Sequence, residues 1–226
     1  MVARQYDEIK KRVEAACQRA GRNPEEVTLI AVSKTKPVEM LREAYEAGAR
    51  DFGENKVQEI LAKEPKLPED IRWHMIGHLQ TNKVRQIVGK TCLIHSVDSV
   101  RLAEEIHKES VKKGLVTQIL LEVNVAEAES KFGFHVEEVE DALKQIQELS
   151  GVCVRGLMTI APFVDNPEDN RPVFQKLNKL YVDMKTKNID NDTMNILSMG
   201  MTGDFEVAVE EGATMVRVGT GIFGAR

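Results

Sequence analysis

Eight short apolar or β-branched runs alternate with stretches of helical spacing, and this alternation constrains the fold more than any other feature of the sequence. The runs cover residues 27–33, 49–53, 71–77, 92–97, 117–125, 152–158, 194–200 and 214–220. Glycines end several of the helical stretches, at Gly48, Gly114, Gly151 and Gly212. Such alternation requires parallel strands joined by crossover helices. We therefore predict a compact (β/α)8 barrel of the TIM type, with an open doubly wound sheet as the alternative.

An additional helix is predicted before the first strand, at about residues 3–20. No linker, internal repeat or low-complexity tract divides the chain, so we expect one domain over residues 1–226.

Composition and charge exclude several classes of protein function. The chain has 226 residues, 42% of them hydrophobic, which is typical of a globular protein. Its net charge of −5 argues against a general nucleic-acid or anionic-membrane binder, because such proteins carry a basic surplus. Cys17, Cys92 and Cys153 are far apart and lack CxxC spacing, so neither disulfides nor a metal site is predicted. Without a signal peptide or a long apolar segment, a cytoplasmic protein with no membrane contact is expected.

Polar residues follow the predicted strands, where TIM-type barrels carry their chemistry. Lys34 ends the first strand, in the segment Ser33-Lys34-Thr35. It could extend to solvent as a rim charge. Alternatively, partial desolvation beside another cation would make its amine a nucleophile toward carbonyl groups.

Two glycine-containing turns follow the seventh and eighth strands. The segments 198–202 and 219–221 offer hydroxyls and backbone N–H groups at the barrel positions that favour phosphate, although glycines also serve simply to make tight turns. Arg217 lies inside the apolar eighth strand, and its parity places it on the same face as Met215 and Gly219. A buried arginine either pairs with a carboxylate or faces a ligand.

An amine, an arginine and two phosphate-binding turns at one barrel mouth describe a site for a small phosphorylated aldehyde or ketone. Pyridoxal 5'-phosphate (PLP) fits all three parts, because its aldehyde would join the lysine and its ring nitrogen needs a partner. A phosphosugar aldolase fits the first two parts equally well.

Several blocks of the sequence resemble the pyridoxal phosphate homeostasis protein family, whose members are related to the barrel domain of bacterial alanine racemase. The blocks are AVSKTKP, FGENKVQE, WHMIGHLQTNK, HSVDS, GLMTIAP and LSMGMTGDFEVAVEEGATMVRVGTGIFG, and they extend from about residue 21 to Gly224. The resemblance implies a TIM-type barrel that binds PLP as an internal aldimine on Lys34.

The same resemblance implies roles for the turns. Ser198 and Gly200 on one turn, and Gly219 and Thr220 on the other, would hold the phosphate. Arg217 would face the pyridine nitrogen.

Further residues are assigned more loosely by the resemblance. Asn55 and Met199 would line the ring, and Lys36 and Lys131 would assist cofactor handover or secondary binding. From its position after the third strand, His78 is expected at the rim or at a helix start, where it would approach the cofactor.

Binding is expected to be the whole function, with no catalytic residue. An arginine is a poor proton donor to the ring nitrogen, so the ring would be a weak electron sink. The racemase relatives take a catalytic tyrosine from an additional domain, whereas this chain ends at Arg226 and its tyrosines (Tyr6, Tyr45 and Tyr181) fall in predicted helices.

We expect a monomeric PLP carrier or buffer that passes the cofactor transiently to apo-enzymes. A PLP-dependent racemase or decarboxylase is the alternative.

Other features are given structural interpretations. His74 and His78 straddle a strand and would lie too far apart to share a metal ion, so His74 is predicted to pack inside the barrel. Met194, Met199 and Met201 are expected mainly to fill the core. Residues 63–70 and 162–172 are predicted to be solvated loops.

Overall fold

The strands of this protein form a closed parallel barrel in sequence order. The computed structural model describes residues 1–127, 132–187 and 193–225. The strands are β1 Thr28–Val32, β2 Asp51–Glu54, β3 Arg72–Met75, β4 Leu93–Val97, β5 Thr117–Glu122, β6 Val152–Met158, β7 Ile196–Ser198 and β8 Met215–Val218. Each strand pairs with the next, and β8 pairs with β1 to close the sheet. The predicted (β/α)8 barrel is confirmed, and the open sheet is wrong.

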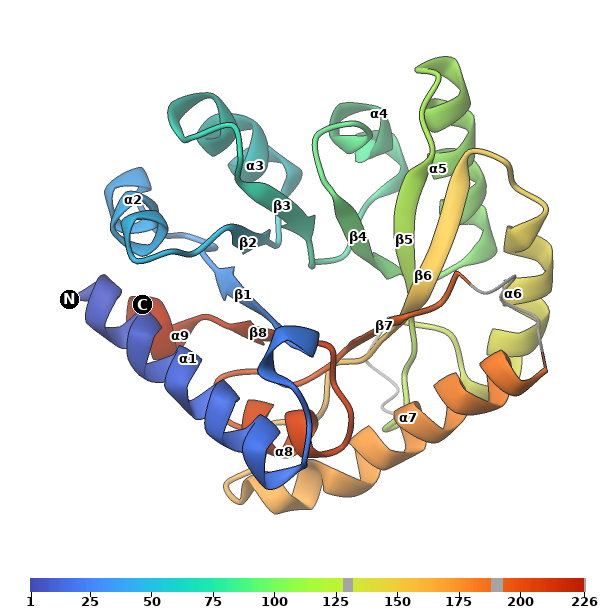
Figure 1. Ribbon diagram of the computed structural model, residues 1–226. Helices are drawn as coiled ribbons and strands as arrows, with labels where there is room; N and C mark the ends of the chain where they lie inside the picture. Colours follow the sequence, from blue (N-terminus) through green and yellow to red (C-terminus); the bar gives the residue numbers. More distant parts are fainter. Residues whose placement is uncertain (128–131, 188–192, 226) are drawn as a thin grey trace.

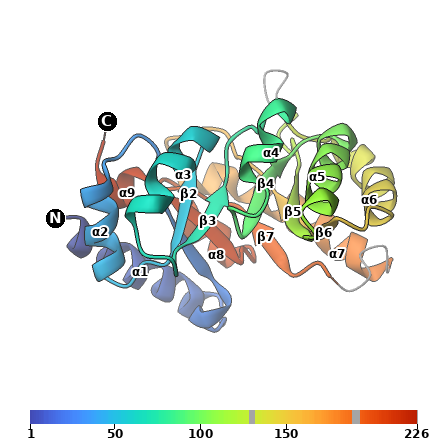
Figure 2. The same cartoon turned by 90° about the horizontal axis from the view of Figure 1, so that it is seen from above.

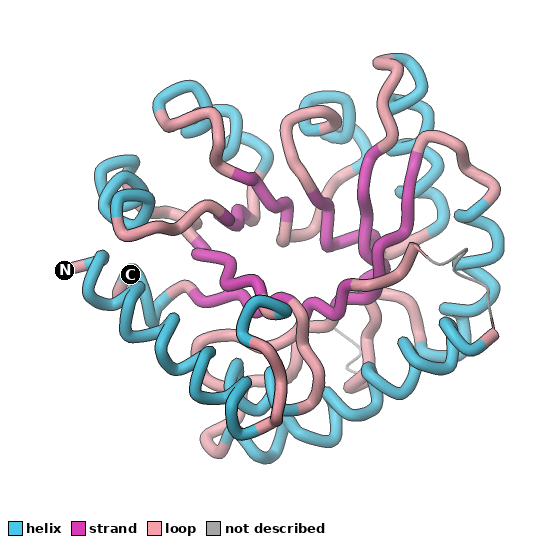
Figure 3. Tube along the Cα trace, viewed as in Figure 1, coloured by secondary structure: helices cyan, strands magenta, loops and turns pink. Residues whose placement is uncertain are grey.

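Helices surround the ring of strands (Figures 1 and 3). They are α1 Val2–Arg19, α2 Val38–Glu46, α3 Val57–Lys63, α4 Val84–Ile87, α5 Val100–Lys112, α6 Val139–Gln147, α7 Arg171–Thr186, α8 Phe205–Glu210 and α9 Thr220–Phe223. Figure 2 shows the barrel from the side, with both chain ends at the same end of the molecule. None of the described helices combines the length and apolarity that a membrane span requires.

Two of the predicted loops need correction at their ends. Lys63 is the last residue of α3 and is buried, because its amine is held by carboxylates beneath the helix. Residues 64–66 and 167–170 form short 3₁₀ helices, and α7 already begins at Arg171.

The apolar core is divided by the sheet. The main cluster fills the space between the strands and the outer helices, and it includes Val216 and Val218. Two small clusters, one around Ile30 and one around Leu93, both contact Met215 and lie inside the barrel. This division confirms the predicted parity of β8, with Arg217 on the interior face.

Helix α1 precedes the first barrel strand and packs against the outside of the barrel. Its buried residues recur at helical spacing, from Val2 through Ile9 to Cys17, and it contacts α8 and α9. The helix predicted at residues 3–20 is therefore confirmed to within one residue.

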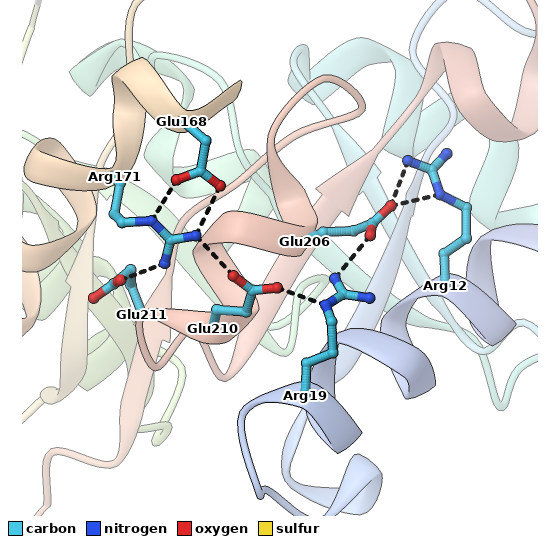
Figure 4. A network of polar contacts seen from close by, with 7 residues as sticks. All are labelled: Arg12, Arg19, Glu168, Arg171, Glu206, Glu210 and Glu211. Atoms are coloured by element: carbon cyan, nitrogen blue, oxygen red, sulfur yellow. Dashed lines mark hydrogen bonds and ion pairs between the residues drawn. The ribbon is translucent and has the colours of Figure 1, made fainter. Parts of the chain in front are cut away.

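Ion pairs reinforce this attachment (Figure 4). Arg12 and Arg19 of α1 both bond to Glu206 of α8, and Arg19 also bonds to Glu210. Arg171 then joins Glu210 to Glu168 and Glu211, so one network connects α1, α7 and α8.

Replacing Arg19 with methionine tests whether the network contributes to stability. Because the pairs are partly exposed, we expect Arg19→Met to lower the free energy of unfolding by up to about 1 kcal/mol at low salt, and by less at about 1 M salt. Urea denaturation at the two salt concentrations measures this. Arg4→Met, which removes only a pair within α1, is the matched control. An equal loss at both concentrations would show that packing, not charge, is responsible.

Candidate functional site

The first strand ends in a tight turn that carries Lys34. The Ser33 N–H donates to Gly53 O on β2, and the Lys36 N–H donates back to Ser33 O, both at 3.0 Å. Thr35 has φ of +63°, a left-handed conformation that is unfavourable for a residue with a branched Cβ. Lys34 is half-buried in this turn. Its position is therefore set by a backbone geometry that needs support from outside the turn.

Three charged side chains, Glu54, Glu59 and Lys63, supply that support and are called the clamp here. Lys63 Nζ donates to Ser33 O at 2.9 Å, to Glu54 Oε1 at 2.7 Å and to Glu59 Oε2 at 2.8 Å. Glu59 Oε2 in turn accepts the Thr35 N–H at 2.7 Å. The clamp thus holds the backbone on both sides of Lys34 and uses all three ammonium protons of Lys63.

Glu54 is the buried member of the clamp. It is fully inaccessible, and its Oε2 has no hydrogen-bond partner among the described residues. Burial raises its pKa to about 7, against the opposing effects of Lys63 and of the Ser33 hydroxyl, which donates to Oε1 at 2.7 Å. Burial therefore disfavours the ionised form of Glu54, and Lys63 and Ser33 favour it.

The turns after β7 and β8 lie against each other. The Arg217 N–H donates to Gly200 O at 3.0 Å, joining the two strand ends. Gly200 has φ of +89°, and a Cβ there would come within 2.5 Å of the Ala208 side chain. The N–H groups of Gly219 and Gly221 converge on Thr202 Oγ1, at 3.3 and 3.4 Å. Converging backbone donors of this kind suit a phosphate oxygen.

These turns also lie beside the end of β1, just before Lys34. A Cβ added at Gly219 would lie 3.4 Å from both Cβ and O of Val32, two residues before the lysine. The pairing of Ile30 with Arg217 fixes this neighbourhood. The structure therefore brings the Lys34 turn and the predicted phosphate-binding turns to one end of the barrel.

Arg217 is held at both ends of its guanidinium inside the barrel. One terminal nitrogen donates to Ser198 Oγ at 2.5 Å, and the other to Thr159 O at 2.8 Å. Burial lowers its pKa to about 10, while the charges of Glu122 and Asp204 oppose that shift. Arg217 therefore remains a cation at pH 7, at a fixed orientation.

Some residues that were predicted to contact the ligand make contacts with other parts of the protein. The Met199 side chain lies in the main core outside the barrel, so any contact with a ligand would come from its backbone. Asn55 is half-buried and lies close to Gly77: a Cβ added at Gly77 would lie 2.5 Å from Asn55 O.

Two further predicted residues lie near the chain end. Thr220 is exposed at the start of α9, and Lys36 Nζ donates to Gly224 O and Ala225 O. The Lys131 prediction lies outside the described residues.

His74 and His78 have separate partners. His78 lies at the rim, bonded to Asp98 at 3.0 Å and stacked on Phe132 with ring centroids 3.9 Å apart. His74 lies inside the barrel, as predicted, and is only 2% exposed. Within the described parts of the chain, no group of three or more potential ligands is arranged to hold a metal ion.

Sequence reasoning missed the clamp, and it included Thr202 only as part of the segment 198–202. The spacing of Glu59 and Lys63 on one helix face was a usable signal for an ion pair. Nothing local indicated that this pair would reach Ser33 and Thr35 of another unit of the barrel.

The residues present fit a small phosphorylated aldehyde. A supported lysine turn, converging backbone N–H groups and a buried cation supply partners for a carbonyl carbon, a phosphate and a ring nitrogen. 

Comparison with known proteins agrees with this fit. The family model described as "Alanine racemase, N-terminal domain" matches residues 5–226. A pyridoxal phosphate homeostasis protein of Aquifex aeolicus is 47% identical over 96% of this chain and 95% of its own length. One of Escherichia coli K12 is 36% identical over 100% of this chain and 97% of its own.

Solved structures of related proteins share the fold of this chain. PipY of Synechococcus elongatus with PLP bound has a TM-score of 0.84 and 36% identity, covering 99% of this chain and 100% of that chain. Alanine racemase of Streptomyces coelicolor shares the fold alone, with a TM-score of 0.70 and 19% identity over 98% of this chain and 59% of that chain. The chain belongs to the alanine racemase N-terminal domain family, and within it to the pyridoxal phosphate homeostasis proteins.

Proposed function

We propose that this protein binds PLP through Lys34 at the carboxyl end of the barrel and serves in PLP homeostasis as a carrier or buffer. The observation that carries the proposal is the convergence of the Gly219 and Gly221 N–H groups on Thr202 Oγ1, beside the end of β1 and two residues from Lys34. The relatives named for PLP homeostasis and the PLP-bound PipY structure support it.

Each part of the site has a role in holding the cofactor. When bound, PLP supplies an electrophilic aldehyde and a ring that can withdraw electrons. The clamp keeps the Lys34 turn in place, and the N–H groups of Gly219 and Gly221 receive the phosphate. Ser198 and Gly200, Thr220 and the Asn55 loop complete the walls of the proposed site.

Arg217 favours binding over catalysis. Its guanidinium keeps its proton at neutral pH and therefore leaves a facing ring nitrogen unprotonated, which weakens electron withdrawal. The three tyrosines lie on the outer helices α1, α2 and α7, where Tyr45 bonds to Asp70 and Tyr181 to Met194 O. We therefore propose a non-catalytic, monomeric protein of the cytoplasm that passes PLP transiently to apo-enzymes.

Lys34→Ala tests the covalent attachment. Wild-type protein incubated with PLP and then reduced with borohydride should gain the mass of one reduced cofactor on the Lys34 peptide. The Lys34→Ala variant should lose this modification, whereas Lys56→Ala, which removes an exposed lysine beside α3, should retain it. Mass spectrometry of the digested protein measures both. A wild-type protein that stays unmodified would rule out the proposed function.

Lys63→Met tests the clamp. Leaving Glu54 and Glu59 without their shared cation should destabilise the fold by about 3 kcal/mol and weaken PLP capture on the order of tenfold. The double variant Glu54→Gln/Lys63→Met should recover part of the stability, because it removes a buried charge, but not the capture. Thermal unfolding and titration with PLP separate the two effects. Full capture by the single variant would mean that the turn needs no clamp.

Arg217→Glu tests the weak electron sink. A carboxylate facing the ring nitrogen would stabilise its protonated form, so transamination of the bound cofactor by added amino acids should rise on the order of tenfold. Arg217→Met, which removes the cation without adding an acid, should not show this rise. Absorbance of the bound cofactor follows the reaction. If Arg217→Glu binds PLP and its transamination rate is unchanged or lower, the account of Arg217 is incorrect.

A further inference from the structure

A continuous line of hydrogen bonds crosses the barrel interior from β2 to β8. Asp51 Oδ1 lies 2.9 Å from His74 Nε2, His74 Nδ1 lies 2.9 Å from His95 Nε2, and His95 Nδ1 lies 2.9 Å from Ser198 Oγ. Ser198 Oγ then accepts from Arg217 at 2.5 Å. These five residues, called the interior relay here, are each at most 7% exposed.

The chemistry of the two ends gives the relay one direction. Arg217 can only donate, and an ionised Asp51 can only accept. Although burial opposes it, hydrogen bonds from His74 and Arg72 lower the pKa of Asp51. His74 must therefore present its Nε2–H to Asp51, because a bare nitrogen would face a carboxylate oxygen at 2.9 Å.

With both imidazoles neutral, every remaining proton is assigned. His74 Nδ1 is bare and accepts the His95 Nε2–H, and His95 Nδ1 accepts the Ser198 hydroxyl. Burial, together with the nearby charge of Arg217, holds the pKa of His95 well below its ordinary value. Arg72 also donates two hydrogen bonds to Asp51, so this carboxylate is held from a second side.

We propose that Asp51, His74 and His95 are positioning residues, which hold the Ser198 hydroxyl and thereby fix the Arg217 guanidinium for the ring nitrogen of PLP. This inference rests on the proposed function. It adds that the Ser198 proton is directed into the barrel, so the phosphate receives its hydrogen bonds from the backbone N–H groups of the turns.

The interior of this barrel suits such a role. Interiors of TIM-type barrels are mostly filled by branched apolar side chains, which cost nothing to desolvate. Here a polar line shares the interior with the two small apolar clusters, and it ends on the guanidinium that Thr159 O holds from the other side. The line thus ends on the residue that the proposed function places against the ring nitrogen.

Nitrogen-15 NMR of the cofactor-free wild-type protein tests the direction of the relay. From the donor directions along the line, we expect His74 and His95 each to carry a proton on Nε2 and none on Nδ1. His107, whose Nδ1 accepts the Gly151 N–H outside the barrel, provides an internal reference for the same form. A doubly protonated His74, or a His95 protonated on Nδ1, would reverse the direction and overturn the inference.

His95→Phe tests the positioning role, because it keeps a ring in place and interrupts the line between His74 and Ser198. We expect PLP binding to weaken on the order of tenfold and the absorption band of the bound cofactor to shift. Asp51→Asn, at the far end of the line, should produce a smaller change of the same sign. His107→Phe is the matched control and should leave both quantities unchanged.

The outcomes separate the two proposals. If Lys34 captures PLP in the wild type and folded His95→Phe and Asp51→Asn have unaltered affinity and spectrum, the positioning role is wrong and the proposed function stands. If wild-type Lys34 captures no PLP, the proposed function fails, and the positioning role fails with it. Should His95→Phe not fold, Ser198→Ala replaces it, with the same expected loss and spectral shift.

Discussion

The pairing of β8 with β1 is the interaction on which the rest of the site depends. It joins the first strand of the barrel to the last, and its register places Ile30 opposite Arg217. Only this closure brings a lysine from the start of the chain beside turns from its end. In an open sheet of the same strands, the two edges would lie on opposite sides of the molecule, and no common site for an aldehyde and its phosphate could form.

Strand parity lets the same short segments serve packing and chemistry together. In β8, Val216 and Val218 contribute to the core between sheet and helices, while Arg217 points inward. At the end of β7, Ser198 belongs to the interior and Met199 to the outer core. Because the large apolar cluster lies outside the barrel, most of the hydrophobic stabilisation does not depend on the polar groups within. The interior can therefore carry charges that a single central core could not.

The sequence was sufficient to predict what depends on period and order. Alternation along the chain predicted the strands, and parity predicted that Arg217 shares a face with Met215 and Gly219. The clamp and the relay depend instead on contacts between units. The sequence analysis placed Lys63 in a solvated loop. Its burial follows from its ion pair with Glu54, which lies in another element. Asp51 and His95 come from strands that are not neighbours, so only the barrel geometry, through His74, connects them.

The arrangement of protons in the described residues supports the proposed function, in which the site binds an aldehyde without driving further chemistry. Acid–base catalysis needs a group that can give up and recover a proton at the reacting atom. Here the three ammonium protons of Lys63 are committed to the clamp, and both terminal nitrogens of Arg217 are tethered. In the relay each donor points away from the proposed ligand, toward Asp51. Polar groups fixed in this way orient a cofactor well, yet moving a proton toward the cofactor would require the whole line to reverse.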